Sequence, residues 1–239
     1  IIQAADVLLA RFQEKGQFIQ AWGKKGAPNE YRLIIDSLLN LPLLFEASRL
    51  SGHQKYAQVA RAHYQQVLEH IVRQDYSTYH TFYYDPQTGA PWKGATAQGY
   101  SDDSCWARGQ AWILLGMPLY KRFNPDVMEK VRYQHLLDYY FDHSAKDEIP
   151  YWDLIFDDNS NEPKDSSAAA IVACGLIEAS QQDYQQNGIV YAKGILAALD
   201  RYRTIPGQEG LLQHGVYAYS EGKGVDEANL WGDYFYMEA

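Results

Sequence analysis

The feature that most constrains this chain is a helical pattern of apolar residues along nearly its whole length. Ile34, Leu38, Leu41 and Phe45 recur at helical spacing, and Gly52 ends that segment. Further helices are predicted over residues 1–14, 54–73, 105–123, 127–143, 165–182 and 185–203. The sequence therefore predicts an all-α fold.

The predicted helices form a repeat. Helices rich in small residues start near residues 33, 105, 165 and 226, at spacings of about 72, 60 and 61 residues. The first three are each followed by an amphipathic helix and a long connection, at 76–104, 144–164 and 204–225, with room for short strands. Close packing of small-residue helices around one axis, with the long loops at one end, predicts an α/α toroid. The alternative, an open α-solenoid, usually has shorter loops.

Composition limits the function classes. No charge-rich or Pro/Gly-rich linker divides the 239 residues, so one domain over 1–239 is predicted. The net charge of −9 argues against a nucleic-acid partner, and no segment is apolar for long enough to span a bilayer. Two cysteines make no disulfide framework, which favours a reducing cytoplasm. Aromatic residues make up 14% of the chain, which fits either a sugar-binding cleft or a core with many aromatic side chains.

The segment from Gln98 to Trp112 carries the densest group of polar and aromatic residues. Ser104 is a suitable N-cap for the helix that follows it. Arg108 and Trp112 are four residues apart and share a helical face, where they could together bind a carboxylate and stack on a sugar ring. The alternative is that Arg108 pairs structurally with one of the neighbouring carboxylates, at 102 or 103.

The segment Trp106–Trp112 resembles the signature of glycoside hydrolase family 88, the unsaturated glucuronyl hydrolases. Three further segments agree with the family in order: Ile34–Leu41, Lys164–Ala170 and Gly224–Tyr234. The resemblance covers nearly the whole chain. It implies a six-fold (α/α) barrel that releases 4,5-unsaturated uronic acid from glycosaminoglycan-type disaccharides, with no cofactor and no metal. The unsaturated rhamnogalacturonyl hydrolases share the fold, but a Gly-Arg-Gly-Asn-like variant of the Arg108 segment is expected there.

Asp36 is an acidic residue within an apolar helical segment, between Ile35 and Leu38. Such a residue is often a packing or capping carboxylate. Burial would raise its pKa, as a carboxylic acid needs in order to donate a proton near neutral pH. The resemblance implies that Asp36 is the general acid and base: it protonates C4 of the unsaturated ring, and then activates the water that adds at C5.

The same resemblance assigns substrate-binding roles to six residues: Trp22, His80, Gln98, Arg108, Trp112 and Tyr234. Arg108 would hold the uronate carboxylate, and the tryptophans would stack on the sugar. Tyr234 is the weakest of these, because residues 231–236 could equally belong to the core. Ser220 and Lys223 lie in a loop that could meet a sulfate group. His63 and His70 are seven residues apart and do not have the spacing of metal ligands.

A six-fold α/α barrel contains twelve helices, whereas the pattern here predicts about eight. The chain is therefore expected to lack N-terminal and C-terminal helices, and the family's second site aspartate is expected upstream of Ile1. An unsaturated uronate oligosaccharide is the expected partner, and a monomer or weak homodimer the expected state. A cytoplasmic location is expected, with the periplasm as the alternative. A rhamnogalacturonyl hydrolase and a non-catalytic sugar-binding module are the alternative functions.

Overall fold

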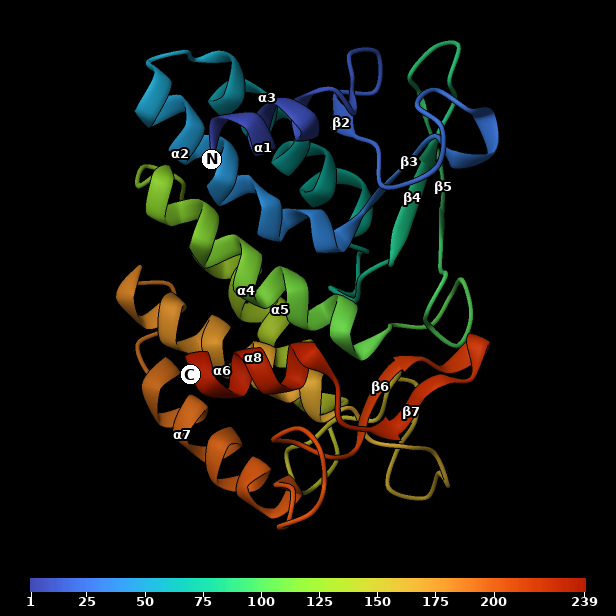
Figure 1. Ribbon diagram of the computed structural model, residues 1–239, viewed down its shortest axis with the longest axis vertical. Helices are drawn as coiled ribbons and strands as arrows, with labels where there is room; N and C mark the ends of the chain where they lie inside the picture. Colours follow the sequence, from blue (N-terminus) through green and yellow to red (C-terminus); the bar gives the residue numbers. More distant parts are fainter.

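The computed structural model describes residues 1–239 and contains eight α-helices that account for the main body of the fold (Figure 1). The helices are α1 (Ile2–Leu9), α2 (Leu41–Ser51), α3 (Lys55–Gln66), α4 (Ala107–Phe123), α5 (Lys130–Asp142), α6 (Ser166–Gln181), α7 (Gly188–Leu199) and α8 (Leu230–Glu238). The strands are β1 (Phe12–Gln13), β2 (Phe18–Ile19), β3 (Arg32–Ile34), β4 (Thr81–Tyr84), β5 (Pro91–Ala95), β6 (Gly215–Ala218) and β7 (Lys223–Glu227).

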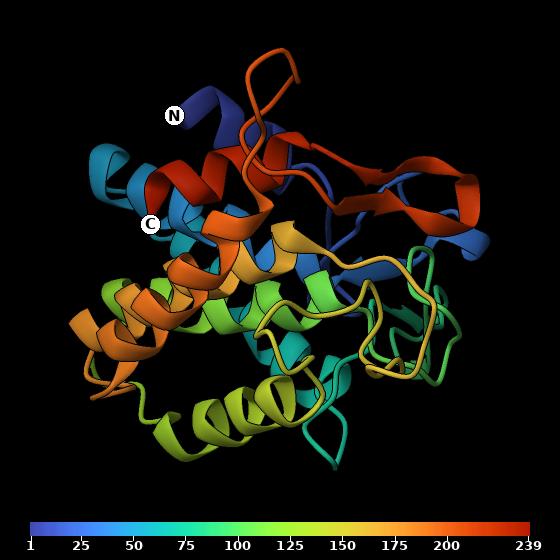
Figure 2. The ribbon, with the colours of Figure 1, turned by 90° about the horizontal axis from the view of Figure 1, so that it is seen from below.

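The helices pair as the repeat predicts. Helix α2 packs on α3, α4 on α5 and α6 on α7, while α4 contacts α6 and α6 contacts α8. In α4 the run Ala107–Pro118 is buried without interruption, and in α6 the run Ser166–Leu176 is buried in the same way. Helices buried on all sides form the inner layer. Figure 2 shows α5 on the outer side of α4.

Glycines allow the inner helices to approach closely. A Cβ atom on Gly175 of α6 would lie 2.7 Å from the carbonyl oxygen of Leu114 in α4. A Cβ atom on Gly116 would lie 2.6 Å from the Cβ of Leu38. Both distances are shorter than van der Waals contact. A larger residue at position 175 would push α6 away from α4, and one at position 116 would push the segment that carries Leu38 away from α4.

The strands lie in the long connections and gather at one end of the helices (Figure 1). Strands β3, β4 and β5 form an antiparallel sheet in that order, while β6 and β7 form a hairpin. The predicted short strands are therefore confirmed in the connections 76–104 and 204–225. The connection 144–164 forms no strand and has only two isolated bridges, between Tyr151 and Lys164 and between Asp153 and Trp106.

Four predicted helix starts or ends were wrong. The inner helix predicted to start near residue 33 begins as α2 only at Leu41, because residues 32–34 pair with β4 and residues 35–40 form a 3₁₀ helix. The first helix ends at Leu9 rather than residue 14, because β1 pairs with β2. The last helix begins at Leu230 rather than near 226, because the preceding residues form β7 and the side chain of Asn229 caps the helix. Ser104 does not cap α4; its hydroxyl donates to Asp153, 2.7 Å away.

The segment that carries Asp36 is a 3₁₀ helix, Ile35–Asn40, which follows β3 directly and leads into α2. The amide of Ile35 donates to the carbonyl of His80, 3.0 Å away, so the start of this helix is tied to the residue that precedes β4. Ile35 and Leu38 are buried against α4. Asp36 therefore lies where the sheet meets the inner helices.

Candidate active site

One oxygen of Asp36 is buried without a hydrogen-bond partner. Its Oδ2 atom is inaccessible to solvent, although 34% of the side chain as a whole is exposed. Burial raises the pKa of Asp36 from 3.8 to about 6, although the charge of Arg108 and the nearby indole N–H of Trp112 act in the opposite direction. The carboxyl group therefore titrates close to neutral pH, and about one tenth of it is protonated at pH 7.

His80 faces Asp36 with a defined tautomer. Its Nδ1 atom accepts hydrogen bonds from the backbone amides of Ala97 (3.0 Å) and Gln98 (3.2 Å), so the neutral ring carries its proton on Nε2. This Nε2 atom lies 3.7 Å from Asp36 Oδ2 and has no partner of its own. Burial, with a smaller contribution from Arg108, lowers the pKa of His80 to about 3. His80 is therefore a neutral hydrogen-bond donor.

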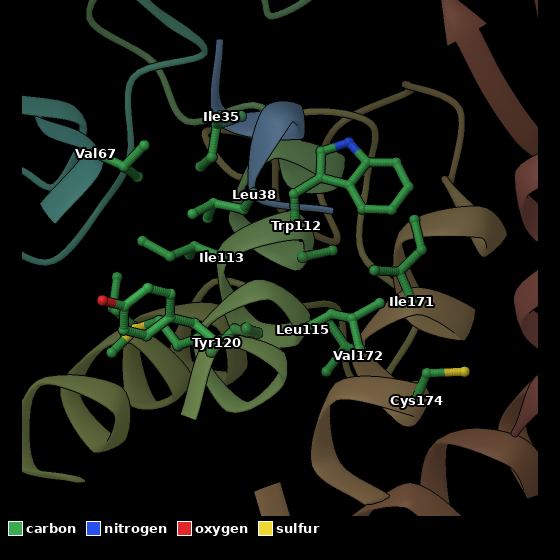
Figure 3. Close-up of a cluster of buried hydrophobic side chains, with 14 of the residues drawn as sticks. Ile35, Leu38, Val67, Trp112, Ile113, Leu115, Tyr120, Ile171, Val172 and Cys174 are labelled. Carbon is green, nitrogen blue, oxygen red and sulfur yellow. The ribbon is translucent and has the colours of Figure 1, made fainter. Parts of the chain in front are cut away.

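Trp112 supplies another unpaired donor beside Asp36. Its Nε1 atom is buried without a direct partner at hydrogen-bond distance, yet it is close enough to lower the pKa of Asp36. In Figure 3 the indole nitrogen points away from the packed side chains of Ile171 and Val172. Three buried polar atoms, on Asp36, His80 and Trp112, thus lie near one another without forming hydrogen bonds. Buried polar atoms without partners are uncommon, and a group of them indicates a functional site.

Arg108 lies in the first turn of α4 and is 2% exposed. Its guanidinium group donates to Asp165 Oδ2 (3.1 Å), to the carbonyl of Tyr217 (2.7 Å) and to that of Val216. It also lies over the rings of Trp106 and Trp231, 4.6 and 5.5 Å from their centroids. The structural partner is therefore Asp165 and not a carboxylate at 102 or 103.

Asp165 was missed as a site residue at the level of sequence. It is completely buried at the N-cap of α6, where its side chain accepts from the amide of Ser167 (3.1 Å) and from that of Val216 (3.4 Å). An Asp-Ser-Ser segment before an alanine run is an N-cap signal, which could have identified the cap but not the partner. Asp165 and Arg108 together fix the β6–β7 hairpin over the ends of α4 and α6.

Gln98 and Trp22 lie at the rim of this group. The side chain of Gln98 donates to the same Tyr217 carbonyl as Arg108, at 3.1 Å. The ring of Trp22 lies 6.5 Å from the ring of His80. The structure thus brings together Asp36 and five of the six predicted binding residues.

Tyr234 is the exception. It is half exposed on α8 and lines a separate groove with Leu39 and Cys174. A cavity of about 620 Å³, lined by residues such as Glu162 and His214, is also separate and contains none of the predicted site residues. The candidate site is therefore defined by its polar geometry and not by cavity size.

His63 supports the 3₁₀ helix that carries Asp36. It is fully buried; its Nδ1 atom accepts from the amide of Ile19 (2.9 Å), so its Nε2 atom donates to the hydroxyl of Ser37 (2.6 Å). The Ser37 hydroxyl in turn donates to the carbonyl of Ile34. Burial lowers the pKa of His63 to about 3. His63 is thus a buried neutral side chain whose hydrogen bonds hold the residue next to Asp36.

The two buried histidines predict that stability falls as the pH decreases from about 6.5 to about 4. Their pKa values are near 3 in the folded state and 6.5 ordinarily, so only the unfolded state takes up these protons in that window. Each histidine should lower the free energy of unfolding by about 1.4 kcal/mol per pH unit. Asp36 has the opposite effect on stability between pH 3.8 and about pH 6: because folding raises its pKa, the folded state takes up this proton first, and acidification through this range stabilises the fold.

Urea unfolding between pH 7 and pH 4.5 measures this slope. His63→Gln should be less stable than wild type at pH 7 and should lose stability less steeply with acidification. Equal slopes for the two proteins would mean that His63 is already protonated in the folded state.

Comparison with known proteins supplies the family. The model of Glycosyl Hydrolase Family 88 matches residues 1–238. The chain belongs to this family. It is 45% identical to an unsaturated chondroitin disaccharide hydrolase of Streptococcus pneumoniae, over 100% of this chain and 62% of that protein.

Solved structures agree with this assignment. An unsaturated glucuronyl hydrolase from Bacillus sp. GL1 is 38% identical with a TM-score of 0.94, over 99% of this chain and 65% of that one. A mutant from Streptococcus agalactiae, complexed with dGlcA-GalNAc6S, is 39% identical with a TM-score of 0.79, over 99% and 60% of the two chains. The predicted α/α barrel fold is confirmed. The chain spans less than two thirds of the length of these proteins.

Two further observations concern metals and membranes. No three His, Cys, Asp or Glu side chains are arranged to hold a metal ion. None of the helices is both long enough and apolar enough to cross a bilayer.

Proposed function

We propose that the protein, in its full natural length, is a glycoside hydrolase that releases 4,5-unsaturated uronic acid from glycosaminoglycan-type disaccharides. The observation that carries this proposal is the convergence of Asp36 Oδ2, His80 Nε2 and Trp112 Nε1, three buried polar atoms without partners, around a carboxyl group with a pKa of about 6. Its similarity to an unsaturated chondroitin disaccharide hydrolase supports the same reaction class.

Asp36 would perform both proton transfers. Its protonated carboxyl group donates the proton to C4, and the resulting carboxylate accepts a proton from the water whose oxygen bonds to C5. The hemiketal at C5 opens by breaking the C5–O5 bond, which leaves a ketone at C5 and a hemiacetal at C1. The hemiacetal then collapses to an aldehyde, and the partner sugar leaves as an alcohol that keeps its own oxygen and takes the hemiacetal proton. One group that titrates near pH 6 suits this cycle, because it must give up a proton and regain it in each turnover.

The other residues would bind and orient the sugar. His80 and Trp112 carry unpaired N–H groups beside Asp36 that would donate to the sugar, and the ring of Trp22 offers a stacking face. Arg108 lies near Asp36 and supplies positive charge for the uronate carboxylate, although Asp165 and two backbone carbonyls already accept from it. We expect a reducing cytoplasmic location, which the two buried free cysteines, Cys105 and Cys174, support.

The test is hydrolysis of three purified disaccharides in parallel: unsaturated chondroitin, hyaluronan and rhamnogalacturonan. The conjugated double bond absorbs in the ultraviolet, and its hydration abolishes the absorbance. We expect loss of absorbance with the first two substrates. Activity on rhamnogalacturonan alone would replace this proposal by the pectin-degrading alternative. Binding of all three without turnover would favour a non-catalytic sugar-binding module.

A further inference from the structure

Aromatic and cationic side chains alternate in a row across the three-stranded sheet, beginning at the candidate active site. In the register of the sheet, Arg32 of β3 lies opposite Tyr83 of β4, which lies opposite Lys93 of β5. The Arg32 guanidinium is 4.1 Å from the ring centre of Trp22 and 4.9 Å from that of Tyr83. The Lys93 ammonium is 5.7 Å from Tyr83 and 4.9 Å from the ring of Trp92. We call these five side chains the aromatic–cationic row.

The row is continuous with the site. Trp22, at its inner end, lies beside His80, and His80 faces Asp36. At the outer end, the rings of Tyr83 and Trp92 meet edge to face with their centroids 6.2 Å apart, so Trp92 is in contact with the rest of the row. A ligand that extends from Asp36 past Trp22 would therefore meet the row next.

The inner part of the row is rigid. Arg32 is largely buried, forms an ion pair with Glu30 at 2.9 Å and donates to the hydroxyl of Tyr83. Its charge is thus balanced within the protein, and its main effect is to hold the rings of Trp22 and Tyr83 in place. A preorganised pair of rings suits a sugar better than mobile ones, because less conformational freedom is lost on binding.

The outer end is exposed and carries an unpaired charge. Trp92 is 66% exposed, and Lys93 is exposed and forms neither an ion pair nor a hydrogen bond. An exposed indole beside a free ammonium offers a stacking face and a cation in one place, which are the two groups that an acidic sugar requires. Since the net charge of the chain is −9, such an ammonium group would attract an anionic sugar locally and not through a broad positive field.

We propose that Tyr83, Trp92 and Lys93 form a further subsite, which binds an acidic sugar of a longer chain whose unsaturated end lies at Asp36. The ring of Trp92 stacks on the sugar, and Lys93 pairs with its carboxylate or sulfate. This inference rests on the function proposed above and extends it from disaccharides to oligosaccharides.

The experiment compares an unsaturated chondroitin disaccharide with an unsaturated chondroitin hexasaccharide, using the full-length protein. Lys93→Gln and Trp92→Ala should leave kcat/KM for the disaccharide unchanged. For the hexasaccharide, each should lower kcat/KM by about threefold to tenfold, the size expected for one exposed ion pair or one aromatic stack. Lys146→Gln removes the same charge from an exposed loop position outside the row and should affect neither substrate.

Equal effects on both substrates, or no effect on the hexasaccharide, would overturn the subsite. Failure of the wild-type protein to hydrolyse the disaccharide would instead refute the proposed function. In that case, calorimetric binding of a saturated chondroitin hexasaccharide still tests the subsite. Weaker binding by Lys93→Gln than by Lys146→Gln supports it, and equal binding overturns it.

Discussion

Asp36→Asn is expected to reduce kcat by about 10²–10⁴-fold in the full-length protein, the range over which general acid–base catalysis contributes to rate. The amide preserves the shape of the side chain but has no acidic proton to donate to C4, and it is too weak a base to accept one from the attacking water. Because the substitution leaves the N–H groups of His80 and Trp112 free to donate to the sugar, KM should change little. The measurement is loss of ultraviolet absorbance under saturating disaccharide, with KM determined separately.

The pH dependence gives an independent check on Asp36. Since the reaction begins from its protonated form, kcat/KM should decline as the pH rises above about 6, the pKa to which burial raises this group. Asp36→Asn should remove this decline from whatever activity remains. A profile that keeps the same inflection in the variant would assign the ionisation, and with it the proton donor, to another group.

Arg108→Ala is expected to destabilise the protein by about 3–5 kcal/mol, the cost of leaving one member of a buried ion pair without its partner. Asp165 would remain completely buried, and the carbonyls of Val216 and Tyr217 would lose their donor, so the β6–β7 hairpin would no longer be fixed. Binding of the uronate should weaken as well. Urea unfolding measures the first effect, and KM for the disaccharide measures the second.

Two further variants separate these effects. Arg49→Ala breaks an exposed pair with Glu46 and should change stability by less than about 1 kcal/mol. Asp165→Asn in the Arg108→Ala background removes the isolated charge and should restore part of the lost stability without restoring uronate binding. If the double variant recovered uronate binding together with stability, Arg108 would act only as a structural support.

The helix pairs could be predicted from the sequence because their signal is local. The small residues and the apolar spacing of α4 and α6 can be read directly from the sequence, and they are the same features that bury these helices in the fold. Asp36 could be proposed for a similar reason, since a carboxyl group among Ile35 and Leu38 must be buried or close to buried surface. Its catalytic role came from the resemblance to the family and not from the spacing.

The features that could not be predicted depend on partners distant in the sequence. Strand β3 exists only because β4 pairs with it, and that pairing makes the next segment a 3₁₀ helix rather than the start of α2. Asp165 meets Arg108, 57 residues away, and the amide of Val216, 51 residues away. Such contacts leave no periodic trace along the chain, because β-structure and buried polar networks are decided by tertiary packing.

The pairing of Arg108 with Asp165 also bears on how quickly a ligand arrives. A buried cation held against a carboxylate acts at a distance as a dipole, and its field fades well before that of a net charge of −9. An anionic sugar approaching this surface would be repelled over most of its path and attracted only on contact. Because dissolved salt screens the long-range repulsion more than the short-range contacts, the encounter rate would rise with ionic strength, opposite to what electrostatic steering produces.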